Sequence, residues 1–155
     1  LYKEILKTNP NHTFAHYNLG MKFKELGELQ KAMSCYKKAI QIDPNFANAH
    51  NNLGNVFKEL GEKEKAVDCY EKTIQIDPNN TVAYCNLGTI LEELDHLNVA
   101  KKNFEKSLSL DSNLKKTCQG YGVLLLKLNQ HIKALTYIRK GTGIIRFTQK
   151  EVKII

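Results

Sequence analysis

Residues 51–61 read NNLGNVFKELG and nearly repeat residues 17–27, which read YNLGMKFKELG. The same frame returns in residues 85–95 as CNLGTILEELD and, in a weaker form, in residues 119–129 as QGYGVLLLKLN. Successive copies begin 34 residues apart. A fixed period of this length is the sequence signature of a protein built by stacking one small structural unit several times.

The period predicts how the chain is organised. Three full repeats span residues 13–46, 47–80 and 81–114, and a degenerate fourth repeat spans residues 115–141. We interpret residues 1–12 as the last helix of a repeat that is truncated upstream. Residues 142–155 are basic and lack the period, and we interpret them as an irregular or helical C-terminal cap, or as a linker.

Each repeat contains two helical patterns separated by a residue that suits a helix end. These residues are Gly27, Gly61, Asp95 and Asn129, and their types best tolerate the left-handed backbone that ends many helices. After the second pattern comes Asn9-Pro10, Asp43-Pro44 or Asp77-Pro78. Proline stops a helix because it lacks an N–H group and clashes with the preceding turn. At the last boundary Ser112 replaces proline, so this turn is less firmly marked.

Apolar and small residues recur at the spacing of a helix face. In the first repeat the predicted core stripe consists of His16, Leu19, Gly20, Phe23 and Leu26. In every repeat a glycine of the first helix is expected to face an alanine of the second, so that the two helices approach closely. A bulky aromatic residue is then expected to fill the neighbouring space.

These positions resemble the tetratricopeptide repeat (TPR) family. The matching frame is N-L-G, then an aromatic residue or Leu, then Gly, Ala, Tyr or Phe, a small residue and D-P-N. The repeats are most similar in style to the N-terminal repeats of O-linked N-acetylglucosamine transferase. The resemblance covers about residues 1–141. It implies an all-α, right-handed superhelical solenoid of antiparallel helix pairs, whose first helices line a concave groove.

One asparagine in each full repeat stands directly before the core leucine. Asn18, Asn52 and Asn86 therefore lie ~100° around the helix from the core stripe, on a second stripe that the resemblance places on the concave wall. Their carboxamides offer two donors and an acceptor to the main chain of an extended peptide. They are equally suited to bond an adjacent helix and stabilise stacking, and the sequence leaves both roles open. The row ends at Gly120.

The predicted peptide-binding residues are these asparagines and their neighbours on the same stripe: Tyr17, Asn18, Asn51, Asn52, Asn55, Lys58 and Asn86. A second TPR precedent is the carboxylate clamp that holds the acidic C-terminus of heat-shock chaperones, and Asn55, Asn86 and Lys116 match it. However, Asn51 and Gly120 stand where a lysine and an arginine of the clamp belong. Binding in that mode is therefore disfavoured.

We expect a non-catalytic protein–protein interaction scaffold that binds a peptide segment or a partner helix in its concave groove. The alternative is the partner-recruiting TPR region of a larger enzyme of the glycosyltransferase, sulfotransferase or 2-oxoglutarate oxygenase type. The sequence holds no phosphate-binding loop and no nucleophile motif, so neither catalysis nor a cofactor is expected. His12 and His16 have the spacing of a metal pair, but no further ligands complete a site.

Positive charge is concentrated at the C-terminal end. Residues 1–114 carry 14 Lys against 15 Asp or Glu, whereas residues 115–155 carry nine Lys or Arg against one Glu. Such a patch would attract nucleic acid, anionic lipid or an acidic protein, but few aromatic residues accompany it for stacking on bases. We therefore favour a solvated surface. No apolar run approaches the ~20 residues that span a bilayer.

The four cysteines favour free thiols. Cys35 and Cys69 share a repeat position, so their backbones should lie ~10 Å apart, beyond the ~7 Å that a disulfide allows. Buried free thiols favour a reducing, cytoplasmic compartment, although the sequence leaves the localisation open. The exposed ends of a solenoid also offer a surface for self-association.

Overall fold

The computed structural model describes residues 2–143, 145–147 and 152–154. The chain divides into two compact units, residues 1–78 and residues 79–155. The first unit contains α1 (Tyr2–Thr8), α2 (Thr13–Glu25), α3 (Leu29–Ile42), α4 (Ala47–Glu59) and α5 (Lys63–Ile76). The second contains α6 (Thr81–Glu93), α7 (Leu97–Leu110), α8 (Lys115–Lys127) and α9 (His131–Thr142). Two short strands, β1 (Ile145–Phe147) and β2 (Val152–Ile154), follow α9.

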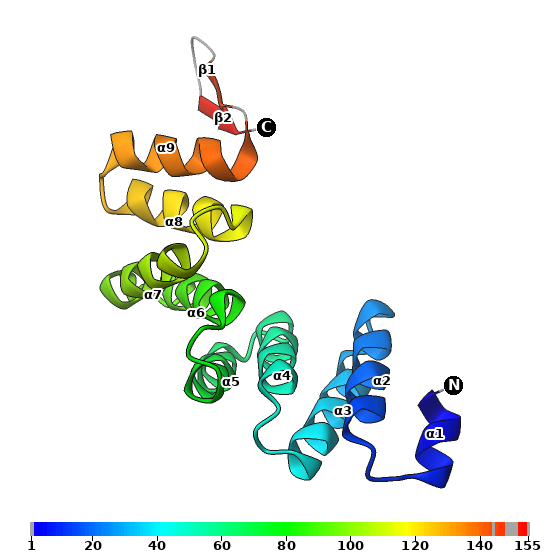
Figure 1. Ribbon diagram of the computed structural model, residues 1–155. Coiled ribbons are helices and arrows are strands. Elements are labelled where there is room, and N and C mark those ends of the chain that lie inside the picture. The colour runs from blue at the N-terminus through cyan, green and yellow to red at the C-terminus, as the bar shows by residue number, and fades with distance from the viewer. Residues whose placement is uncertain (1, 144, 148–151, 155) are drawn as a thin grey trace. The chain divides into compact units, whose positions relative to one another are not determined.

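Each repeat forms one pair of helices joined by a short turn (Figure 1). The pairs are α2 with α3, α4 with α5, α6 with α7 and α8 with α9. In the first unit α3 also packs on α4, and in the second α8 packs on both α6 and α7. The predicted all-α solenoid of helix pairs is confirmed in both units.

The turn inside each pair has one conformation throughout. Gly27, Gly61, Asp95 and Asn129 all have positive φ, with values of 73°, 79°, 63° and 57°. The next residue donates its N–H back across the turn, as from Glu62 to the Phe57 carbonyl at 2.9 Å. This bond satisfies a carbonyl that the helix end would otherwise leave unpaired. The predicted left-handed helix ends are therefore confirmed.

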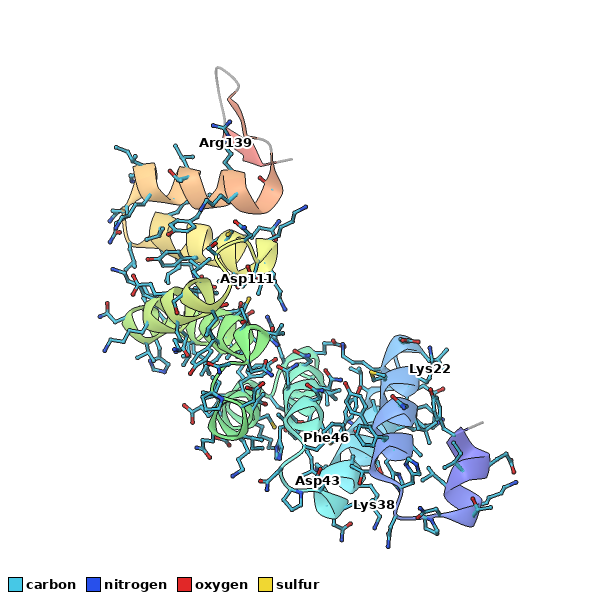
Figure 2. The ribbon with its side chains drawn as sticks, viewed as in Figure 1. Lys22, Lys38, Asp43, Phe46, Asp111 and Arg139 are labelled. Atoms are coloured by element: carbon cyan, nitrogen blue, oxygen red, sulfur yellow. The ribbon has the colours of Figure 1, made fainter. Side chains whose placement is uncertain are left out.

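The turn between repeats is held by side chains as well as by proline. The carboxylate of Asp43 accepts the N–H of Asn45 at 3.0 Å. Asp111 accepts that of Asn113 at 2.9 Å, although Ser112 replaces proline there (Figure 2). An aspartate that accepts the N–H two residues on closes a turn by itself. The last boundary therefore keeps its geometry without proline.

A histidine that recurs in two repeats contacts the turn between repeats from the helix that follows it. The Nε2 atom of His16 lies 2.8 Å from the carbonyl oxygen of Pro10, and that of His50 lies 3.0 Å from the carbonyl of Pro44. His12 begins α2 by accepting the N–H of Ala15 on its Nδ1 atom. These contacts give the histidines structural roles.

The close packing inside each pair differs in detail from the sequence expectation. In the first three repeats the nearest neighbour of the core glycine is an aromatic ring, not an alanine, whereas in the fourth repeat Gly122 lies against Ile138 and the carbonyl oxygen of Ala134. A Cβ atom on Gly54 would lie 2.7 Å from Cε1 of Tyr70, and one on Gly20 would lie 2.7 Å from Cε1 of Tyr36. Glycine is needed at these positions because the ring occupies the place of its missing side chain.

One member of the predicted core stripe is exposed. Leu26 is 70% exposed, whereas Leu60, the equivalent residue one repeat later, is half-buried and lines a surface hollow with Leu29 of α3. The placement of Leu26 in the core was therefore wrong.

The end of the chain folds differently from the irregular or helical cap that was expected. Gly143, with φ 81°, ends α9. The strands β1 and β2 pair antiparallel, with Ile145 opposite Ile154, and β1 contacts α9. The remainder of the predicted cap or linker, residues 144, 148–151 and 155, lies outside the described residues.

Candidate functional site

The predicted contact residues fall in both units. Six of them belong to α2 and α4 of the first unit, and Asn86 belongs to α6 of the second. We call the polar stripe on α2 and α4 the first-helix face and define it by Phe14, Tyr17, Asn18, Met21, Lys24, Asn51, Asn52, Asn55 and Lys58. Except for exposed Phe14, these residues are half-buried. They combine partial exposure with fixed backbone, as a binding surface requires.

Asn52 links the two helices of this face. Its Nδ2 atom donates to the hydroxyl oxygen of Tyr17 across 3.1 Å. One of the two donors of the Asn52 carboxamide is therefore used between two helices of the stack. The same carboxamide also lies close enough to Tyr36 to offset part of the rise that burial causes in the pKa of that phenol. The stacking role that the sequence left open is supported for Asn52, and contact with a ligand stays a prediction.

An aromatic cluster that sequence analysis did not identify lies beside Asn52. Phe46 directly precedes α4 (Figure 2). The centroid of its ring is 4.9 Å from that of Tyr17 and 5.1 Å from that of Phe14. Phe14 is nevertheless 61% exposed. Phe46 follows Asp43-Pro44 in the turn, outside any helical stripe, so periodicity gave no signal for it. The cluster adds an apolar patch to a row of carboxamides.

Asn55 has a partner inside its own repeat. Its Oδ1 atom accepts a hydrogen bond from the hydroxyl of Tyr70 at 2.9 Å. Tyr70 is fully buried against Gly54, so the bond connects the first-helix face to the core. Asn51 and Lys58 lie on the same helix one turn to either side, at the spacing that places residues on one face.

Asn86 occupies the corresponding position in the second unit but is only 3% exposed. Its Oδ1 atom accepts a hydrogen bond from the ammonium of Lys116, 2.7 Å away on α8. A buried carboxamide bonded to the next repeat stabilises the stack. The geometry therefore supports the stacking role for Asn86, and its contact with a ligand stays a prediction.

The asparagine row ends at Gly120 for a steric reason. A Cβ atom there would lie 2.9 Å from the ring of Phe104, which also packs against Gly88 at 3.0 Å. The Phe104 ring therefore fills the space between α6 and α8, and no side chain fits at residue 120. Because residue 104 precedes residue 120 by half a repeat, the period alone does not bring the two together.

Successive first helices are also joined by ion pairs. Lys24 of α2 lies 2.8 Å from Glu59 of α4. In the second unit Glu92 of α6 pairs with Lys127 of α8. Lys24 and Glu92 share one repeat position and Glu59 and Lys127 another, so the pair recurs with its charges exchanged. The contact with Glu92 raises the pKa of Lys127.

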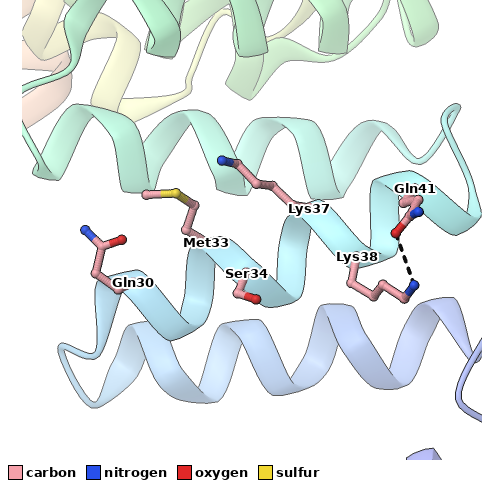
Figure 3. Close-up of a pocket in the computed structure, with 6 residues that line it drawn as sticks. All are labelled: Gln30, Met33, Ser34, Lys37, Lys38 and Gln41. Atoms are coloured by element: carbon pink, nitrogen blue, oxygen red, sulfur yellow. Dashed lines mark hydrogen bonds between the residues drawn. The ribbon is translucent and has the colours of Figure 1, made fainter.

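A second hollow lies on α3, and none of its lining residues is a predicted contact residue. It has a volume of about 450 Å³ and is lined by Gln30, Met33, Ser34, Lys37, Lys38 and Gln41 (Figure 3). All six residues come from α3, and Lys38 donates a hydrogen bond to Gln41 at 3.1 Å. A face built from one helix is shallow, so it serves below as a control surface.

The described residues contain free thiols, but neither a cluster of metal ligands nor a helix that could span a membrane. The four cysteines are free thiols: Cys85 and Cys118 are buried, whereas Cys35 and Cys69 are only half-buried, not buried as expected. Burial raises the pKa of Cys35 and, together with Asp68, raises that of Cys69 to about 11. No metal-binding cluster of three or more His, Cys, Asp or Glu occurs among these residues. Nor does this part of the chain contain a helix long and apolar enough to span a membrane.

The fold defines the class of protein first. Helix pairs that recur every 34 residues and pack on their neighbours form a helical-repeat solenoid. A family model described as TPR repeat matches residues 20–61. Two further models, both described as tetratricopeptide repeat, match residues 47–80 and 69–101. Residues 20–101 therefore carry tetratricopeptide repeats. This fold generally serves as a non-catalytic interaction module.

Solved structures show the same fold. MamA is 25% identical, with a TM-score of 0.81 over 92% of this chain and 83% of that one. PilF of Pseudomonas aeruginosa is 26% identical, with a TM-score of 0.84 over 92% of this chain and 65% of that one. The first TPR of Spaghetti (RPAP3), bound to the HSP90 peptide SRMEEVD, is 22% identical, with a TM-score of 0.73 over 76% of this chain and 93% of that one. A search of the curated proteins gave no match.

Proposed function

We propose that this chain is a non-catalytic interaction scaffold that binds an extended peptide segment on the first-helix face. One observation carries the proposal: the face joins an exposed aromatic patch, formed by Phe14 with Tyr17 and Phe46, to the carboxamides of α4. Aromatic side chains supply apolar contact area. Carboxamides pair with peptide groups without reading a side chain. The combination suits a main chain that lies across both.

The proposed mode differs from the clamp that holds an acidic C-terminus. A TPR structure of similar fold is bound to the peptide SRMEEVD. In this chain Asn51 and Gly120 replace two cations of the clamp, and the ammonium of Lys116 donates to Asn86. We therefore expect selection of neutral or mixed peptides, with affinity derived from the aromatic patch and from main-chain hydrogen bonds. The likeness of the asparagine row to the repeats of O-linked N-acetylglucosamine transferase stays a prediction.

The test starts from a library of random displayed peptides selected on the wild-type chain. Asn51→Ala combined with Asn52→Ala should weaken binding of the selected peptides about tenfold or more, because each lost hydrogen bond costs ~0.5–1.5 kcal/mol. Titration calorimetry on the folded fraction measures the effect. Gln30→Ala with Lys38→Ala, in the hollow on α3, is the matched control and should leave the affinity unchanged. Equal affinity of the Asn51/Asn52 variant and the wild type would rule out these carboxamides as contacts.

A further inference from the structure

One buried hydroxyl in the first unit has no hydrogen-bond acceptor. Tyr36 is 0% exposed. The amide of Asn52, which donates to Tyr17, also lies close enough to the Tyr36 oxygen to offset part of the rise that burial causes in the pKa of that phenol. However, among the residues that the structure describes, no acceptor lies within hydrogen-bond geometry of the Tyr36 hydroxyl. Buried polar groups are nearly always paired, since an unpaired one has lost its water without compensation. The hydroxyl of Tyr36 therefore needs a functional or structural account.

The next repeat contains the same tyrosine with a partner. Tyr70 corresponds to Tyr36, and its hydroxyl donates to Asn55 at 2.9 Å. In the first repeat Met21 takes the place of Asn55, so the acceptor is a weak thioether. Phe104 occupies the position in the third repeat and packs on Gly88 without any hydroxyl. Packing alone thus does not require a hydroxyl at residue 36.

Tyr36 lines a small pocket in the first unit, between α2, α3 and α4. The pocket has a volume of about 240 Å³, and Met21, Lys24, Glu25 and Asn52 are its other lining residues. The volume is below the ~300–1,000 Å³ of pockets that enclose a whole small molecule. It suits one group of a larger ligand that lies on the first-helix face.

The lining is electrically balanced. It contains one cation, Lys24, which pairs with Glu59 at 2.8 Å, and one anion, Glu25, which pairs with Lys22 at 2.6 Å. A charged ligand group would have to compete with one of these pairs. Burial raises the pKa of the Tyr36 phenol, so at neutral pH the group is a protonated donor. A donor in a neutral pocket calls for an uncharged acceptor.

We propose that this pocket is a subsite for a neutral amide carbonyl, which accepts a hydrogen bond from the hydroxyl of Tyr36 beside the carboxamide of Asn52. The inference rests on the proposed function, in which a peptide lies on the first-helix face. The amide is either a main-chain group of the peptide or the side chain of an Asn or Gln within it. A carboxylate does not suit the subsite, because it would have to take Lys24 from its ion pair with Glu59.

The experiment titrates the whole chain with small probes and follows the ring signals of Tyr36 and the side-chain amide signals of Asn52 by NMR. The probes are N-methylacetamide for a main-chain amide, propionamide for a side-chain amide, and acetate as the anion. At least one amide should shift both signals saturably, and acetate should not. N-methylacetamide alone would identify the main chain as the source, and propionamide alone would identify a side chain. Absence of saturable amide binding, or preference for acetate, would overturn the subsite.

Three variants assign the effect to this hydroxyl. Tyr36→Phe should weaken amide binding about fivefold, which is the loss of one hydrogen bond. Tyr70→Phe, the same change at the paired tyrosine, should leave it unchanged. Met21→Asn should also weaken amide binding, because it supplies Tyr36 with the acceptor that Asn55 gives Tyr70. This variant keeps the test decisive even if Tyr36→Phe folds poorly, and unchanged amide binding in it contradicts the proposal.

The readouts separate this subsite from the wider proposal. Selected peptides that lose affinity with Asn51→Ala and Asn52→Ala, but bind Tyr36→Phe as tightly as the wild type, would leave the scaffold function standing and overturn the subsite. Saturable amide binding that depends on Tyr36, without any selected peptide, would uphold the subsite and reject the peptide-binding function.

Discussion

Replacing Phe104 with alanine should lower the free energy of unfolding by about 3–5 kcal/mol, the usual cost of deleting a buried aromatic ring. The ring is fully buried. It stands 3.0 Å from where a Cβ atom of Gly88 would be and 2.9 Å from that of Gly120. Its loss therefore opens a cavity against α6 and α8 together. Urea unfolding followed by circular dichroism at 222 nm measures the change.

Phe14→Ala is the matched control, because the Phe14 ring is exposed and should cost less than ~1.5 kcal/mol. If Phe104→Ala were no more costly than Phe14→Ala, the ring would not hold the two repeats together, and the explanation for the break in the asparagine row would fail.

Gly54→Val should lower the free energy of unfolding by about 3 kcal/mol, at the upper end of the usual cost of overpacking. The first added carbon would lie 2.7 Å from Cε1 of Tyr70 and 3.1 Å from Cβ of Cys69. The Cβ atom of Cys69 is fixed to the backbone of α5, so it can give way only if the whole helix moves. The displaced Tyr70 ring would also lose its hydrogen bond to Asn55. The same urea titration gives the measurement.

Gly61→Asn tests the alternative that replacing any glycine of the repeat lowers the free energy of unfolding by the same amount. Nothing lies within 4 Å of a Cβ atom on Gly61, and its backbone has φ 79°. Asn129 adopts a similar conformation at the equivalent position, so we expect a cost below ~1 kcal/mol. If Gly61→Asn lowered the free energy of unfolding as much as Gly54→Val, backbone conformation and not the aromatic ring would set the requirement for glycine.

The features that repeat were predictable from the sequence. The 34-residue period placed every helix pair, and the residues at 27, 61, 95 and 129 identified the turns, because helix ends depend on local backbone preference. The period also placed the predicted contact residues on the first helices. These are properties of one repeat taken alone.

The features that join one repeat to the next were not predictable in the same way. Tyr17 accepts from Asn52, and Phe104 excludes a side chain at Gly120, because each pair meets only after the helices pack. Such contacts depend on which side chains stand opposite one another across two helices, and a stripe on a single helix does not contain that information.

The central claim is that partners bind on the first-helix face and not in the hollow on α3. Backbone NMR of the wild-type chain with a selected peptide tests it most directly. We expect the largest shifts at Tyr17, Asn51 and Asn52, while the signals of Gln30, Ser34 and Lys38 on α3 stay in place. Shifts concentrated on α3, with α2 and α4 unaffected, would contradict the account.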